Sequence, residues 1–133
     1  MIRLTMKSFR IRLLFLLVLM VVPPVAFSQS AAEKSWRPFW TQFSAAVRAK
    51  NKAAVKRLMS SERDFFSGGG GETRDQWLQM LDDNKLWGLV QKSVAKGVIP
   101  YNESGRIGRI TKDRHLIFQY IGGRWRFVGV MGD

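Results

Sequence analysis

Residues 115–131, HLIFQYIGGRWRFVGVM, decide the fold of this chain. They contain two runs of β-favouring residues on either side of Gly122-Gly123, a pattern typical of a β-hairpin because both glycines accept a positive φ. The two-residue loop sets the register and predicts four facing pairs: Ile121 with Arg124, Tyr120 with Trp125, Phe118 with Phe127, and Leu116 with Gly129. The large aromatic side chains then share one face. Helices must cover that face, because an isolated hairpin is only marginally stable in water.

Further strands are expected ahead of this hairpin. Residues 106–112 join it through a loop over 112–114, which predicts Ile110 opposite Leu116 and Gly108 opposite Phe118. Residues 98–101 could add a fourth strand. Helical patterns precede these strands, so the sequence predicts an α+β fold: two to three N-terminal helices packed on a C-terminal antiparallel, curved β-meander that ends in the Gly-Gly hairpin.

The first expected helix is the cover for the aromatic face. Its apolar residues recur at helical spacing: Trp36, Phe39, Trp40, Phe43 and Val47. Ser35 fits the N-cap position, and Pro38 would then lie in the first turn, where its missing N–H costs little.

Two shorter helices have capping signals of their own. Asn51 is expected to cap a helix over 52–59. Thr73 and Gln76 have the spacing of a capping box, which predicts a helix over 74–83.

Three other segments are less defined by their pattern. Residues 86–92 favour a helix, with Asn84 as a cap and Gly97 in the left-handed conformation beyond its end, whereas 93–96 fit either a helix or a strand. Residues 62–66 fit either an edge strand or a turn. The glycines of 67–72 predict a flexible loop; they lack the spacing of a phosphate-binding loop.

The N-terminal segment has the pattern of a secretory signal peptide. Basic residues precede an unbroken apolar run over 13–22, and Ala26-Phe27-Ser28 places small residues at the −3 and −1 positions. We predict a cleaved signal peptide over 1–28 and a single α+β domain over 29–133; a retained membrane anchor is the alternative. The chain has no cysteine. A disulfide framework is therefore excluded, which favours a bacterial periplasmic or secreted protein.

The chain is strongly basic, with a formal net charge of +12. Four of the 22 Lys and Arg residues lie in the predicted signal peptide and all ten acidic residues follow it, which leaves about +8. Such a charge attracts anions, including anionic lipids and acidic polysaccharides of the envelope, although a solvated surface also explains it. Arg109, Arg124 and Arg126 are the predicted anion-binding residues. Nucleic acid is disfavoured as a partner, because the alternation sends Trp125 and Phe127 to the core face.

Catalytic chemistry has few candidates in this sequence. His115 is the only histidine, and with no cysteine the chain lacks the usual ligands of a zinc site. A Ser-His-Asp mechanism would depend on that single ring. We therefore predict no metal, no cofactor and no catalytic residue.

The helical motif Phe39-Trp40-x-x-Phe43 and the ending GGRWRFVGV at 122–130 resemble small exported proteins of the nuclear transport factor 2-like superfamily, which has a cone-shaped, cystatin-like α+β fold. The resemblance covers most of residues 33–131. It implies a curved sheet wrapped around helices, an apolar pocket at the open end, and a homodimer through the sheet. Enzymes of this superfamily that resemble ketosteroid isomerase or polyketide cyclases place Asp, His or Tyr in that pocket.

Three functional hypotheses follow. The first is an exported, non-catalytic binding or accessory domain for a small apolar ligand, with a pocket between the first helix and the sheet. The residues expected to line this pocket are Trp40, Phe43, Trp77, Trp87 and Tyr101. The second is an enzyme of the isomerase or cyclase kind that uses Tyr101, Asp113 or His115. The third is a basic surface module for anionic envelope polymers or lipids.

Overall fold

The computed structural model describes residues 24–83 and 85–132. Ala31–Asp133 form one compact unit. The basic and apolar parts of the predicted signal peptide, and the predicted cap Asn84, lie outside the described residues. Among the helices that the structure describes, none has both the length and the apolar character needed to span a membrane.

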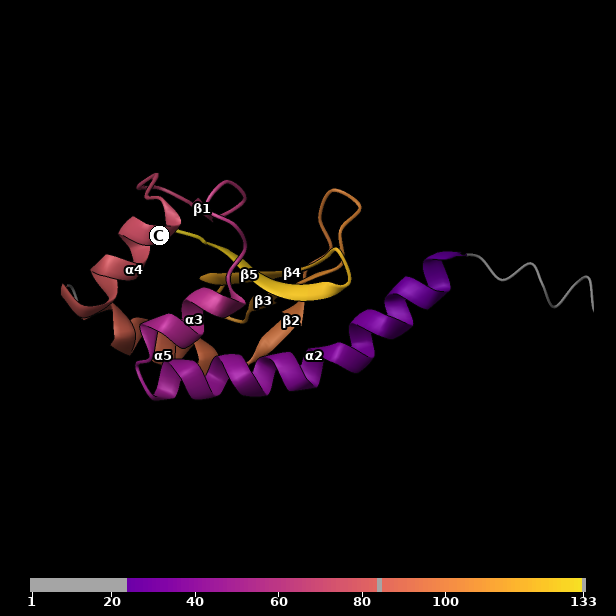
Figure 1. Cartoon of the computed structure of the whole chain (residues 1–133), viewed down its shortest axis with the longest axis horizontal. Coiled ribbons are helices and arrows are strands. Elements are labelled where there is room, and N and C mark those ends of the chain that lie inside the picture. Colours follow the sequence, from indigo (N-terminus) through magenta and orange to yellow (C-terminus); the bar gives the residue numbers. More distant parts are fainter. Residues whose placement is uncertain (1–23, 84, 133) are drawn as a thin grey trace, which may run out of the picture. The chain divides into compact units, whose positions relative to one another are not determined.

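Five strands form a mixed sheet in the order β1-β5-β4-β3-β2. Their bounds are β1 Phe66–Ser67, β2 Val98–Pro100, β3 Gly108–Thr111, β4 Leu116–Ile121 and β5 Arg124–Val130. Strands β2 to β5 form the predicted antiparallel meander, while β1 pairs in parallel with the end of β5. Figure 1 shows helices α2 and α3 along one face of this sheet, with α4 and α5 at one end. The predicted α+β class is confirmed.

The hairpin register is confirmed next to its turn and changes farther along. Gly122 and Gly123 have φ values of 58° and 79°, and the pairs from Ile121↔Arg124 to Phe118↔Phe127 are as expected. A β-bulge then intervenes: Ile117 pairs with Gly129, so Leu116 pairs with Val130, and the predicted Leu116–Gly129 pair was wrong. A bulge sets two residues of one strand against one of its partner. Leu116 and Val130 therefore both lie on the helix-covered face, within its core cluster.

The register between β3 and β4 differs by one residue from the prediction. Ile110 pairs with Ile117, and Arg109 rather than Gly108 pairs with Phe118. The connecting turn is longer than expected, because the Thr111 hydroxyl accepts hydrogen bonds from the backbone N–H groups of His115 and Leu116. A one-residue change exchanges the two faces of a strand. Ile110 therefore joins Ile117 and Val128 in a second buried cluster, on the face opposite the helices.

Four helices are present in the described residues: α2 Pro24–Arg48, α3 Lys52–Leu58, α4 Arg74–Asp83 and α5 Leu86–Lys96. The N-caps predicted for α3 and α4 are confirmed, whereas Gly97 after α5 has φ 80° and ψ −174°, which is not the predicted left-handed conformation. The Asn51 side chain accepts a hydrogen bond from Ala54 N (3.1 Å), and Thr73 and Gln76 exchange side-chain-to-backbone hydrogen bonds of 3.0 and 3.2 Å. Helix α5 extends through residues 93–96, which settles their state as helical. In the undecided segment 62–66, residues 62–64 form a turn, and Phe66 begins the edge strand β1.

The predicted start of the first helix was wrong. Helix α2 begins at Pro24, so Ser35 lies inside it and donates its hydroxyl to Ala31 O at 2.7 Å instead of capping an end. Residues 29–34, QSAAEK, contain no helix breaker, so the helix continues through them. Pro38 consequently lies within the helix rather than in its first turn.

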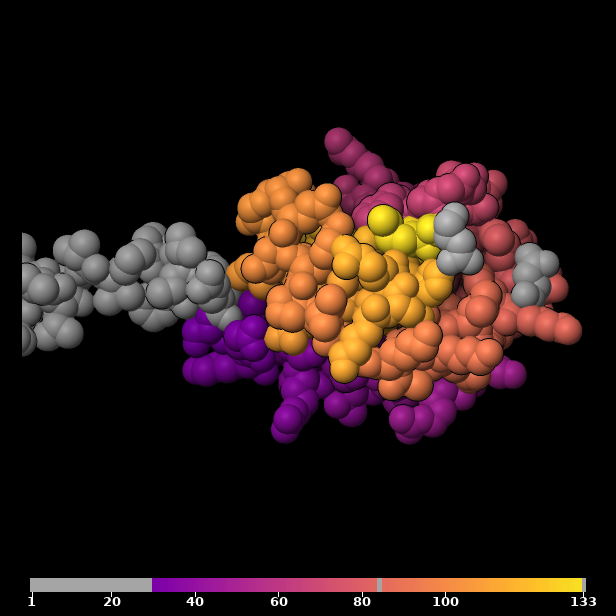
Figure 2. Space-filling model, turned by 180° about the vertical axis from the view of Figure 1, so that it is seen from behind, coloured from indigo at the N-terminus to yellow at the C-terminus, as the bar shows by residue number. Residues whose placement is uncertain are grey.

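Aromatic rings join α2 to the sheet. The ring of Phe118 contacts four rings of α2, at centroid distances of 5.7 Å to Trp36, 5.8 Å to Phe39, 5.6 Å to Trp40 and 5.0 Å to Phe43. Phe127 extends this cluster to Phe65 and to Trp77 of α4. Viewed from the opposite side in Figure 2, the C-terminal strands and their loops form the middle of the surface, with α2 along its lower edge.

Candidate functional site

A pocket of about 270 Å³ lies where α4 and α5 meet the ends of β4 and β5. Its walls come from four parts of the chain and are mainly apolar. They are formed by Ser67, Gly68, Gly70 and Glu72 of the glycine-rich segment, Trp77 and Met80 of α4, Leu86, Leu89, Val90 and Ser93 of α5, and residues His115, Leu116, Val130, Met131 and Gly132 of the sheet ends. The β-bulge contributes directly, because it turns Val130 to the same face as Leu116.

The mouth of the pocket exposes apolar side chains. Leu89 on α5 is 57% exposed, and Met131 beyond β5 is 41% exposed. Deeper in the wall, Trp77 and Val90 are buried. The apolar surface therefore continues from the protein core to the solvent, as expected of an entry for an apolar molecule.

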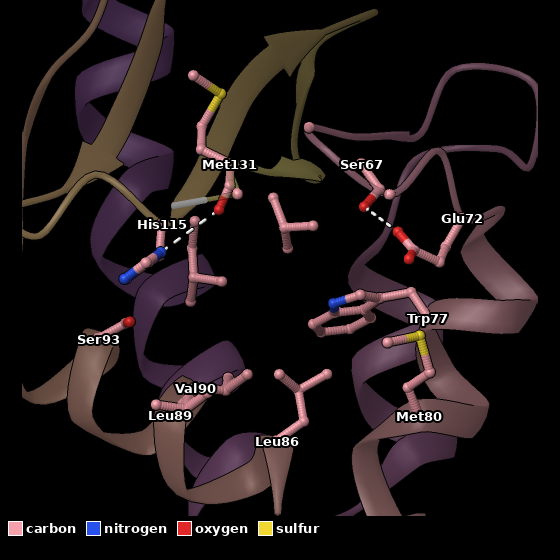
Figure 3. Close-up of a pocket in the computed structure, with 15 residues that line it drawn as sticks. Ser67, Glu72, Trp77, Met80, Leu86, Leu89, Val90, Ser93, His115 and Met131 are labelled. Carbon is pink, nitrogen blue, oxygen red and sulfur yellow. Dashed lines mark hydrogen bonds between the residues drawn. The ribbon is translucent and has the colours of Figure 1, made fainter. Parts of the chain in front are cut away.

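Two polar groups lie on opposite sides of the pocket, as Figure 3 shows. On one side, the Ser67 hydroxyl donates to Glu72 Oε2 at 2.6 Å. This hydrogen bond lowers the pKa of the Glu72 carboxyl, so the group is ionised at neutral pH. On the other side, Nδ1 of His115 lies 3.4 Å from the carbonyl oxygen of Met131. A bound molecule would thus meet a carboxylate at one end and an imidazole at the other.

A side-chain network behind the pocket fixes the position of His115. Asp113 accepts hydrogen bonds from the hydroxyls of Ser93 (2.6 Å) and Thr111 (2.7 Å), and from the backbone N–H of His115 (3.3 Å). Burial alone would raise the pKa of Asp113, but these hydrogen bonds outweigh it and hold the pKa below its ordinary value. The ionised carboxylate therefore ties α5 to the β3–β4 turn and sets the direction in which the chain enters β4.

Only one of the five residues expected to line a pocket does so. Trp77 forms part of the pocket wall. Trp40 and Phe43 belong to the aromatic cluster between α2 and the sheet, where their rings occupy the space in which we expected the pocket. Trp87 is buried in the core and donates its Nε1–H to Asp82 at 2.8 Å. Tyr101 packs against the second cluster, on the other face of the sheet.

The three residues considered for catalysis do not meet in one place. His115 lines the pocket, whereas Asp113 lies behind it and is bound to Ser93 and Thr111. Tyr101 lies in the second cluster, beneath the guanidinium of Arg114, whose Cζ is 5.9 Å from the ring centre. The arrangement that the isomerase or cyclase hypothesis requires is therefore not formed by these residues.

The three predicted anion-binding arginines are also divided between two places. Because of the β3 register, Arg109 lies on the helix-covered face, where it contacts Trp36 and bonds to Glu33 at 3.0 Å. Arg124 and Arg126 line a separate groove together with α2 and α3. The prediction that all three arginines lie on one face of the sheet was wrong, because it relied on a register between β3 and β4 that is shifted by one residue from the observed one.

Sequence reasoning missed most of the pocket. Glu72, Met80, Leu89 and Met131 line it, and none was singled out. Leu89 carried a usable signal: it is a large apolar residue next to Val90 on a helix whose buried stripe includes Val90, so it had to lie off that stripe. No comparable signal marks Glu72 or Met131, because their position depends on how β1 and β5 meet.

Metal binding finds no support in the described residues, where no group of three or more His, Asp and Glu side chains could hold an ion.

Comparison with models of protein families, with curated proteins and with solved structures gives no match for this chain. The resemblance to the nuclear transport factor 2-like superfamily therefore stays a prediction.

Proposed function

We propose that this chain is a non-catalytic binding domain that takes up a small, mainly apolar molecule in the pocket between α4, α5 and the ends of β4 and β5. The observation that carries the proposal is the continuous apolar surface from buried Trp77 to the exposed side chains of Leu89 and Met131. The hypothesis of an apolar pocket is kept, and its place moves from the α2 side of the sheet to the α4–α5 side.

The size of the pocket limits the ligand. Pockets for drug-sized ligands measure about 300–1,000 Å³, and a cavity of about 150 Å³ accepts benzene. A pocket of about 270 Å³ suits one or two rings or a short acyl chain. The ionised Glu72 carboxylate favours a ligand with a hydrogen-bond donor, such as an amine or a hydroxyl, at the end that faces it. Ser67 already donates to this carboxylate and would orient it.

Binding is favoured over catalysis by the positions of the polar side chains. Of Tyr101, Asp113 and His115, only His115 lines the pocket. Asp113 is engaged with hydroxyl donors in the β3–β4 turn. A single imidazole opposite an ionised carboxylate can orient a ligand through hydrogen bonds without any chemical step.

The domain would act after export, as the N-terminal pattern predicts. The proposed processing removes residues 1–28. The mass of the protein recovered from the exported fraction of its host tests this directly, with a chain beginning at Gln29 expected. A mass that includes residue 1 would contradict cleavage and indicate a retained N-terminal segment.

A fluorescent apolar probe tests the pocket. The two-ring probe 6-propionyl-2-(dimethylamino)naphthalene emits at shorter wavelength in apolar surroundings, and its binding should be accompanied by energy transfer from the tryptophans, which include Trp77 in the wall. We expect Leu89→Glu, which places a charge at the mouth, and Met80→Trp, which fills the interior, each to weaken binding at least about fivefold, or about 1 kcal/mol.

The matched control is Ile99→Glu on β2. Ile99 is also an exposed apolar side chain, at 37%, and it does not line the pocket. This variant should bind the probe as the unchanged chain does, and circular dichroism should show all three variants folded. If folded Leu89→Glu and Met80→Trp bound the probe as tightly as Ile99→Glu, the proposed site would be wrong.

A further inference from the structure

A second hollow lies between the C-terminal half of α2, α3 and the first residues of β5. It measures about 700 Å³ and is independent of the proposed ligand pocket, with which it shares no residue. We call it the α2–α3 groove. Its lining residues are Gln42, Ala45, Ala46, Ala49, Asn51, Ala54, Arg57, Leu58, Arg124 and Arg126.

The floor and the rim of the α2–α3 groove differ in chemistry. Four alanines and Leu58 provide an apolar floor, which includes exposed Ala45 on α2 and exposed Ala49 directly after the end of that helix. The charged residues of the lining are Arg57, Arg124 and Arg126, and no acidic side chain accompanies them. The groove therefore combines an apolar surface with a purely positive rim.

The rim of the groove gathers three arginines without an acidic side chain among the lining residues. Some cations elsewhere in the described chain are paired, such as Lys52 with Asp82, Arg74 with Glu62 and Arg109 with Glu33, while others, such as Arg63 and Lys92, form no salt bridge. Within the described residues, neither Arg57 nor Arg124 nor Arg126 forms a salt bridge, and Arg126 instead donates its Nη1–H to the carbonyl oxygen of Arg57 at 3.3 Å. That bond holds the guanidinium of Arg126 against the backbone of α3, and the side chains of Arg57 and Arg126 line the same groove.

We propose that the α2–α3 groove docks an acidic segment of a partner protein, with small apolar side chains of the segment on the alanine floor and its carboxylates on the three arginines. Guanidinium groups match carboxylates in geometry and charge, and an incoming acidic segment would supply the charge that the rim lacks. The alanine floor leaves space for the methyl and isobutyl groups of a peptide.

Other anionic partners fit this groove less well. Single-stranded nucleic acids are held by aromatic side chains on which the bases stack, and no aromatic residue lines the groove. Sulfated or uronic-acid polysaccharides offer hydroxyl-rich surfaces, which the floor of alanine methyl groups cannot bond. An acidic peptide uses both parts of the groove at once.

The experiment compares two fluorescein-labelled peptides by anisotropy with the full chain. One peptide consists of Glu, Ala and Leu, and the other carries Gln in place of every Glu. Binding of the acidic peptide, and little binding of the Gln peptide, is expected at low salt. Removing two rim charges with Arg57→Gln and Arg124→Gln should weaken binding of the acidic peptide about tenfold, as expected for the loss of two charge-assisted contacts.

Two controls separate the groove from the overall positive charge. Arg63→Gln with Lys92→Gln removes the same charge from exposed residues outside the groove, and should change binding less than about twofold. Ala45→Trp fills the floor without changing the charge and should weaken binding, whereas Ala95→Trp at an exposed position on α5 should not. The Ala45→Trp result tests the apolar floor by itself.

Several outcomes would overturn the proposal. They are equal weakening by the two charge-removing pairs, equal binding of the acidic and Gln peptides, unchanged binding by folded Ala45→Trp, or no binding of the acidic peptide to the unchanged chain. Competition with dextran sulfate adds a further arm. If this polymer bound more tightly than the peptide, and if its binding was reduced only by the Arg57→Gln and Arg124→Gln pair, the groove would be a polyanion site and the assignment to a protein partner would be wrong.

Discussion

The guanidinium carbon of Arg109 lies 4.8 Å from the centre of the Trp36 ring, which places a cation of β3 on an aromatic side chain of α2. The same arginine reaches Glu33 at 3.0 Å, while its own side chain is only 17% exposed. Trp125 donates its Nε1–H to Ala32 O at 2.8 Å from the neighbouring part of the sheet. Helix α2 is therefore held to the sheet by specific polar contacts around its aromatic cluster.

The cation on Trp36 should contribute measurably to stability. We expect Arg109→Ala to lower the free energy of unfolding by about 1–2 kcal/mol, because a cation–π contact and the packing of the arginine stem are both lost. Glu33→Gln should cost less than about 0.5 kcal/mol, since Glu33 is 70% exposed and water screens its ion pair. Urea unfolding measures both. Equal losses in the two variants would show that the ion pair, not the aromatic contact, makes the contribution.

Phe118 should be among the most sensitive positions in the core. It is fully buried and contacts the rings of four α2 residues and of Phe127. Phe118→Ala is expected to cost about 3–5 kcal/mol, because it leaves a cavity that neighbouring rings cannot fill. Leu89→Ala, at an exposed apolar residue, should cost less than about 0.5 kcal/mol. Chemical denaturation compares them, and a loss below about 1 kcal/mol for Phe118→Ala would contradict this packing.

Two glycines should respond to alanine in opposite directions. At Gly108 an added Cβ would meet the backbone oxygens of Tyr101 and Phe118, so Gly108→Ala should destabilise by about 1–3 kcal/mol. At Gly88 on α5 the added methyl group meets nothing within 4 Å, so Gly88→Ala should stabilise by about 0.5–1 kcal/mol through its helix propensity. If the two variants shifted the melting temperature in the same direction, either the crowding at Gly108 or the open space at Gly88 would be wrong.

Asp113 should make stability depend on pH in the acidic range. Its pKa in the folded state lies below the ordinary 3.8, so the stabilisation is present above that value and is lost as the pH falls through the lowered folded-state pKa. Asp113→Asn should cost about 1–3 kcal/mol at pH 7, because a charged acceptor of three hydrogen bonds is lost, and less at about pH 2–3.

The exposed Asp83 of α4 is the control for this prediction. Asp83→Asn should leave both the stability and its pH profile nearly unchanged. The free energy of unfolding, measured with guanidinium between pH 2 and 7, reports both variants. A constant difference between Asp113→Asn and the unchanged chain over this range would show that ionisation of Asp113 does not contribute.

Local sequence determined several elements of this fold. The Gly122-Gly123 turn and the alternation beside it were sufficient for the three pairs nearest the loop, because a two-residue turn fixes its own register. Asn51, and Thr73 with Gln76, were recognised as caps since each satisfies backbone groups within a few residues of itself. The aromatic spacing of α2 was likewise sufficient to identify the residues that cover the sheet.

The tertiary structure decided the rest, including both sites. The β3 register depends on Asp113, whose partner Ser93 lies 20 residues earlier on α5, and this register moves Arg109 from the predicted anion-binding face to Trp36. The β-bulge brings Val130 beside Leu116, and the pocket forms only where they meet α4, α5 and the glycine-rich segment. Periodicity reports which side of an element is apolar. Whether two apolar surfaces pack against each other or leave a pocket between them depends on contacts between segments that are far apart in the sequence. The tertiary structure alone determines those contacts.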